Sequence, residues 1–311
     1  MYIFDKSKTT LLKAILPILI LLHHLNGLTS LSWLKPFGVV GIAVVSIFFF
    51  VSGYGLLASY QSKGKAYLDH FITKRIPAVF LPYLLTLCVY LSFRQIVSGG
   101  GNLEYLTTTN FTDWLPYSWF VIELIVFYLL YWAIFRMAKI DDKHKVLLLT
   151  VSIVVAYVLM LVLDLPIYFW RSTPALALGI VYRWYERQIL QMGSKKMMSC
   201  LLTALGLFVL LNVLKIKELN FLLVCVMVIG GLAFVRVKEN KLMIGLSKIS
   251  YEVYLAQSLA IGISQLFIAE KGFLFCIMVI GLDLVIATIL TSINKRLLTC
   301  LVVKPNIKKT K

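Results

Sequence analysis

Long apolar segments alternate with short polar and basic segments along the whole chain. A helix needs about 20 apolar residues to cross a hydrocarbon core of about 30 Å. The alternation predicts ten such helices, at residues 11–29, 38–59, 77–95, 117–135, 146–163, 172–185, 198–214, 219–235, 249–269 and 273–293. The expected fold is therefore all-α, a polytopic membrane helix bundle with about ten transmembrane helices.

The composition agrees with a bilayer as the solvent. Of the 311 residues, 60% are hydrophobic and only 14% are charged, and the mean hydropathy is +0.89. A soluble domain is about 45–50% apolar, so a water-soluble globular protein is excluded. The longest connecting segment, at about 96–116, is too short for a soluble domain. We expect one integral-membrane domain over residues 1–311.

The charge distribution predicts the orientation in the membrane. The chain carries 31 Lys and Arg against 14 Asp and Glu, a net charge of +17. Of the 31 basic residues, 24 fall in alternate connecting segments and at the termini, and six fall in the other segments. Lys and Arg concentrate on the cytoplasmic side of membrane proteins. Both termini are therefore expected in the cytoplasm. Because the basic residues are distributed as in a membrane protein, we expect contact with lipid and no nucleic-acid partner.

The sequence carries no signal for a metal or a bound cofactor. Five cysteines are scattered along the chain with no pair at the spacing of a zinc site or a disulfide framework. A glycine-rich phosphate loop is also absent. We expect no metal site and no resident cofactor.

The first apolar window contains two ionisable side chains, Lys13 and His24. They are eleven residues apart, which places them on one helix face about 16 Å apart along the axis. A histidine at that depth can act as a general base, or it can simply bond a neighbouring helix. Lys13 can hold an anionic ligand from the cytoplasm, or it can extend to the interface.

Three further places combine small, basic or aromatic side chains with an apolar setting. Ser52 and Gly53 admit either a packed helix or a ligand close to the backbone. Arg75 lies in a basic segment before the third window. It can bind a phosphate group, or it can simply be one of the basic residues that mark the cytoplasmic side. Trp119 and Glu123 lie four residues apart in the fourth window. A carboxylate at membrane depth costs free energy, so Glu123 either pairs with a buried base or has a function.

Five separated motifs follow one another along the chain: a basic residue and a histidine in the first window, FFFVSGYGL at 48–56, a basic segment at 71–77, a Trp-Phe pair at 119–120 and LSKISYEVYL at 246–255. In this order they resemble the acyltransferase-3 family of bacterial integral-membrane O-acyltransferases. The chain departs from the family pattern by having Lys13 where an arginine is usual, Ala78 where a second basic residue is usual, and Gln257 where a histidine is frequent.

The resemblance implies a multi-pass protein of the bacterial inner membrane that transfers an acyl group, usually acetyl, from cytoplasmic acyl-CoA to a hydroxyl of a cell-surface or exported glycan such as an exopolysaccharide. It also implies roles for the residues named above. His24 would deprotonate the acceptor with Glu123 orienting its ring, Lys13 and Arg75 would hold the donor, Ser52 and Gly53 would admit its pantetheine arm, and Trp119 would line the tunnel or stack on a sugar.

Two other functions fit a bundle with polar groups at membrane depth. One is a non-enzymatic polysaccharide exporter or flippase, which would not require a histidine on the face of Lys13. The other is a proton-coupled transporter of small solutes, which predicts half-length repeats and broken helices. The sequence contains no such repeat.

Overall fold

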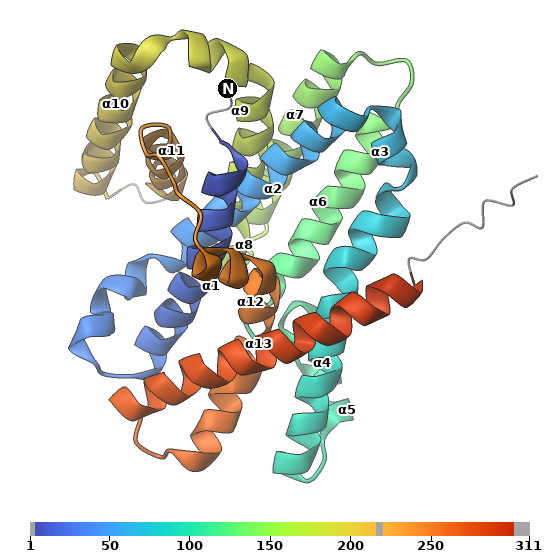
Figure 1. Ribbon diagram of the computed structural model, residues 1–311, viewed down its shortest axis with the longest axis vertical. Helices are drawn as coiled ribbons and strands as arrows, with labels where there is room; N and C mark the ends of the chain where they lie inside the picture. Colours follow the sequence, from blue (N-terminus) through green and yellow to red (C-terminus); the bar gives the residue numbers. More distant parts are fainter. Residues whose placement is uncertain (1–3, 216–219, 302–311) are drawn as a thin grey trace, which may run out of the picture. The chain divides into compact units, whose positions relative to one another are not determined.

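A computed structural model describes residues 4–215 and 220–301, and this part of the chain contains helices and no strand. Figure 1 shows the helices in chain order. They are α1 (Lys6–Leu28), η1 (Ser32–Val39), α2 (Gly41–Lys63), α3 (Lys65–Asp69), η2 (Phe71–Arg75), α4 (Ile76–Ser98), α5 (Asn102–Thr108), η3 (Phe111–Asp113), α6 (Trp119–Phe135), α7 (Asp142–Val162), α8 (Ile167–Ser172), α9 (Pro174–Gln191), α10 (Gly193–Val213), α11 (Asn220–Leu232), α12 (Lys241–Phe267) and α13 (Phe273–Leu301).

The all-α fold predicted from the alternation of apolar and polar segments is confirmed. Each of the ten predicted windows falls on a helix, in the order α1, α2, α4, α6, α7, α9, α10, α11, α12 and α13. Position 219 and Lys217, which entered the prediction, lie outside the described residues, as do the basic residues of the C-terminal segment 302–311.

Six described helices are long and apolar enough to cross a membrane. They are α1, α2, the η2–α4 segment at Phe71–Ser98, α7, α10 and α13. Shorter apolar helices occur at α6 and α11. Charged side chains reduce the hydropathy of α9 and α12. The structure thus supports a multi-pass membrane protein, while ten crossings and cytoplasmic termini stay predictions.

Local sequence signals explain several helix ends. Asp5 accepts a hydrogen bond from the backbone N–H of Lys8 at 2.9 Å and caps α1. Asp141 caps α7 in the same way through the N–H of His144, at 2.8 Å. At the other end of α4, Gly99 has a φ of 69°. This left-handed conformation favours glycine and ends the helix.

The chain divides into two compact units. The first comprises Met1–Tyr67 and Leu130–Ser250, and the second comprises Leu68–Leu129 and Tyr251–Lys311. In the first unit α2 packs along α9, and α10 packs against α11. In the second unit α13 packs against α4. The predicted site residues are therefore divided, with Lys13, His24, Ser52 and Gly53 in the first unit and Arg75, Trp119 and Glu123 in the second.

Candidate functional site in two parts

The first part of the candidate site is the helix α1. One uninterrupted helix carries both Lys13 and His24, so their separation of eleven positions corresponds to about 16 Å along its axis. Lys13 is exposed and His24 is half-buried near the C-terminal end of the helix. The structure thereby agrees with the predicted helical spacing of the base candidate and the cation.

His23, next to His24, is tied to the segment that follows α1. Its Nδ1 lies 3.0 Å from the carbonyl oxygen of Phe37 in η1. Because a carbonyl oxygen only accepts, Nδ1 is the ring nitrogen that donates the proton. A Cβ atom at Gly41, the first residue of α2, would overlap the His23 ring. His23 thus fixes the end of α1 against η1 and α2, while the ring of His24 lies 5.3 Å away at an angle of 59°.

The small residues of the second window take part in helix packing. A Cβ atom at Gly53 would overlap the carbonyl oxygen of Leu176 in α9. The hydrogen in place of a side chain is therefore what allows α2 and α9 to meet at the backbone. Ser52 is half-buried on the same helix. The geometry supports helix packing as the role of Gly53, so only Ser52 is carried into the proposal below.

A buried carboxylate beside this helix pair was missed by the sequence analysis. Glu186 of α9 is 1% exposed, and both of its oxygens accept from the hydroxyl of Tyr54, at 3.0 and 3.2 Å. Arg183 forms an ion pair with it, and the N–H of Phe4 lies 3.5 Å from Oε1. The carboxylate thus joins α2, α9 and the N-terminal segment.

The second part of the candidate site contains Arg75. It ends the five-residue π-helix η2, a local widening that is frequent at functional sites. Its Nη2 donates to the hydroxyl of Tyr128 in α6 at 2.9 Å, and its guanidinium lies 5.2 Å from the centre of that ring. Phe71 packs edge-on against the same ring, at 5.9 Å. Tyr128, which the sequence analysis did not single out, therefore positions Arg75.

Trp119 and Glu123 lie one turn apart at the start of α6. Their spacing of four residues puts them on the same side of the helix. Trp119 is half-buried and packs edge-on against Phe120, while Glu123 is 6% exposed. A carboxylate with so little solvent contact is stable only with compensating polar or charged groups.

The segment LSKISYEVYL connects α12 to three other elements of the second unit. Tyr251 donates to the carbonyl oxygen of Val79 in α4 at 2.8 Å. The amide of Asn294 in α13 donates to Glu252 at 3.1 Å, and the hydroxyl of Tyr254 donates to the carbonyl oxygen of Tyr117 before α6. These bonds give the segment a structural role. The bond from Tyr251 to α4 is one of helix packing.

No group of three metal-ligating side chains occurs in the described ranges 4–215 and 220–301. A family model described as an acyltransferase domain matches residues 9–293, nearly the whole chain. No curated protein and no solved structure matches the chain. The match confirms the resemblance drawn from the separated motifs.

Proposed function

Because the chain belongs to the acyltransferase-3 family, we propose that this membrane acyltransferase moves an acyl group, in the first instance acetyl, from cytoplasmic acyl-CoA to a hydroxyl of a cell-surface or exported glycan. The bacterial inner membrane is the proposed location. The observation that carries the proposal is α1, a single helix with a cation and a histidine three turns apart on one side. An exporter would need the helix but not this pair.

The proposed reaction requires one proton transfer in each direction. An imidazole nitrogen of His24 takes the proton of the acceptor hydroxyl, and the oxygen attacks the thioester carbonyl carbon. The carbon–sulfur bond then breaks, and the departing CoA thiolate takes the proton back from the imidazolium. The acyl group ends as an ester on the acceptor, and neither a metal nor an oxidant is consumed. The half-buried setting of His24 supports this role.

The donor is proposed to bind through its phosphates. CoA carries several negative charges, which guanidinium and ammonium groups bind well. Arg75 is suited to this task because Tyr128 holds its guanidinium in one orientation, and Lys13 is exposed on its helix. Ser52 is proposed to contact the pantetheine arm.

Two residues of α6 complete the proposal. Glu123 is proposed to orient the imidazole of His24 and stabilise its protonated form. Trp119, one turn earlier, is proposed to stack on a sugar ring or to line the path of the substrate. Their position on one side of α6 and the low exposure of Glu123 support a shared task.

The test compares wild type, His24→Ala and His144→Ala in a host that lacks the gene, at matched membrane levels. His144 is an exposed histidine that bonds only Asp141 among the described residues, so it controls for loss of an imidazole. Ester-linked acyl groups on isolated surface glycans are counted by mass spectrometry. We expect acylation with wild type and His144→Ala and none above background with His24→Ala. Unchanged glycan mass with a changed amount of exported glycan would replace the proposal with transport.

A further inference from the structure

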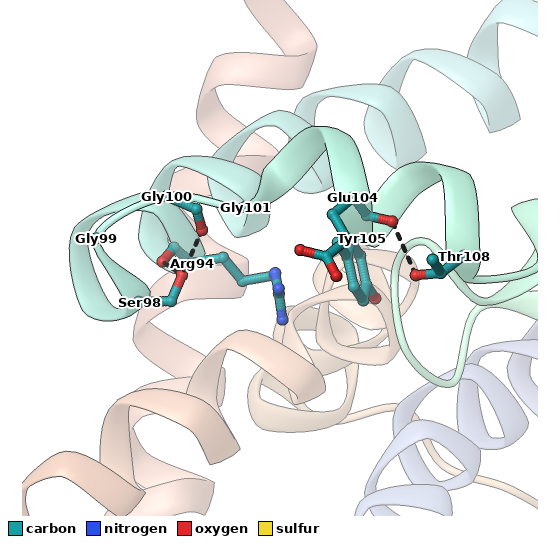
Figure 2. A pocket seen from close by; sticks show the side chains of 8 residues that line it. All are labelled: Arg94, Ser98, Gly99, Gly100, Gly101, Glu104, Tyr105 and Thr108. Atoms are coloured by element: carbon teal, nitrogen blue, oxygen red, sulfur yellow. Dashed lines mark hydrogen bonds between the residues drawn. The ribbon is translucent and has the colours of Figure 1, made fainter.

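A pocket of about 560 Å³ lies where α4 turns into α5, and none of the residues of the proposed reaction lines it. Figure 2 shows that its lining side chains come from the end of α4, the turn of three glycines and one side of α5. The lining residues are Arg94, Ser98, Gly99, Gly100, Gly101, Glu104, Tyr105 and Thr108. Most of them are polar, which is unusual beside a helix as apolar as α4.

Arg94 presents its guanidinium to this pocket. The group lies 3.9 Å from the centre of the Tyr105 ring, a stacked position that fixes its plane. Within residues 4–215 and 220–301, its buried Nε has no hydrogen-bond partner and no carboxylate forms an ion pair with Arg94. The N–H groups of the guanidinium are therefore oriented, and no described residue accepts a hydrogen bond from them. An anion with several oxygens would satisfy them.

The wall that holds Arg94 is itself fixed. The hydroxyl of Tyr105 donates to the carbonyl oxygens of Asp113 and Trp114, at 3.1 and 3.0 Å, and burial raises the pKa of this hydroxyl, which keeps it a donor. Asn102 donates to the carbonyl of Leu91 at 2.9 Å. Because this wall is already fixed, little conformational entropy is lost when a ligand binds.

The pocket lies at the end of a candidate membrane span. Arg94 is four residues before the end of the span Phe71–Ser98, and the predicted topology puts this end on the outer side. Ile96 and Leu103, on the two helices that flank the pocket, are 82% and 78% exposed. Apolar side chains so exposed at the end of a span are expected to contact lipid. The polar pocket beside them then lies at the level of the lipid headgroups.

We propose that this pocket binds a phosphate diester carried by a membrane lipid, with Arg94 binding the phosphate and Glu104 accepting hydrogen bonds from hydroxyls next to it. Figure 2 shows the Glu104 carboxylate on the far side of the guanidinium from the glycine turn. Its negative charge disfavours a ligand with several charges and favours a singly charged diester with a polyol. Phosphatidylglycerol and a polyprenyl-phosphate sugar share this chemistry. The second is the form in which a glycan acceptor would reach the enzyme, an identification that rests on the proposed function.

Native mass spectrometry of the full-length protein in detergent tests the proposal. The probes are phosphatidylglycerol, a polyprenyl-phosphate monosaccharide, and diglucosyl-diacylglycerol, which has the hydroxyls without the phosphate. The variants are Arg94→Gln, Arg94→Lys and Arg136→Gln. Arg136 is the matched control, an exposed arginine over the ring of Trp132. We expect Arg94→Gln to bind both phosphate lipids about tenfold more weakly, as follows from losing charged hydrogen bonds, with Arg94→Lys between it and wild type.

The outcomes separate the possibilities. Equal binding by wild type and Arg94→Gln, an equal loss in Arg136→Gln, or equal retention of the lipid without phosphate would overturn the proposal. If the polyprenyl-phosphate sugar displaces phosphatidylglycerol, the pocket is an acceptor site. If phosphatidylglycerol displaces the sugar lipid, the pocket holds a structural lipid. Either result supports phosphate binding. A wild type that binds through Arg94 but acylates no glycan would refute the proposed function and leave the pocket standing.

Discussion

Gly53 of α2 and Gly179 of α9 each lie against the backbone of the opposite helix. A Cβ atom at Gly53 would overlap the carbonyl oxygen of Leu176, and one at Gly179 would overlap the carbonyl oxygen of Phe50. The contact is thus reciprocal, and each glycine leaves room for the helix that carries the other. Backbone approach of this kind is the usual function of small residues between membrane helices.

The substitution Gly53→Ala is therefore expected to destabilise the protein. The two atoms nearest to the new methyl group are backbone atoms of Leu176, which cannot move without separating the helices, so we expect a loss of about 1–3 kcal/mol or more. Gly55→Ala is the matched control, because no atom lies within 4 Å of its Cβ position. Thermal unfolding in detergent should show a lower midpoint for Gly53→Ala and an equal or higher one for Gly55→Ala. Equal effects of the two changes would refute the packing argument.

The adjacent histidines should separate stability from activity. His23→Ala removes the hydrogen bond to Phe37 and the ring that lies on Gly41, at a cost of about 1–3 kcal/mol in stability. His24→Ala should lower the midpoint of unfolding less than His23→Ala does, and it should reduce the acylation rate by about 10²–10⁴-fold, the usual contribution of a general base. Midpoints and rates are measured on the same membrane preparations. A larger rate loss in His23→Ala than in His24→Ala would show that His24 is not the general base.

The sequence predicts the helices well because apolar length is a local property. Each of the ten windows falls on a helix, since a run such as 273–293 needs no partner to be recognised. The sequence does not show which charged residues near an apolar run lie inside the helix. The charged residues Arg183 and Glu186 lie within α9 and bond each other, which a count of basic residues per connecting segment cannot detect.

For the candidate site, residues are predictable but their partners are not. Arg75 is visible as a basic residue before an apolar run, whereas Tyr128 is one of many aromatic residues in α6. Only the fold brings its hydroxyl to 2.9 Å from the guanidinium. Gly53 shows the converse. A small residue admits a helix or a ligand equally well, and only the structure shows that α9 packs against this one.

Breaking the ion pair of Arg183 and Glu186 should destabilise the first unit strongly. Arg183→Met leaves a carboxylate that is 1% exposed without its cation, which costs about 3–5 kcal/mol. Adding Glu186→Gln removes the uncompensated charge, so the double variant should recover part of that loss. Unfolding of wild type, both single variants and the double variant gives the coupling energy. A double variant less stable than Arg183→Met would show that the pair is not the source of the loss.

The contact between Arg75 and Tyr128 predicts a specific change in kinetics. Tyr128→Phe removes only the hydroxyl that accepts from Nη2 and keeps the ring packed against Phe71. If Arg75 binds the phosphates of the donor, a less oriented guanidinium raises the KM for acetyl-CoA by about 2–10-fold, the effect of one hydrogen bond, and leaves kcat within about twofold. Arg75→Gln should raise this KM further, and Tyr83→Phe, on a neighbouring helix of the same unit, should leave it unchanged. Rates are measured with membranes and radiolabelled acetyl-CoA over a range of donor concentrations. A fall in kcat at constant KM would move Arg75 from donor binding to the chemical step.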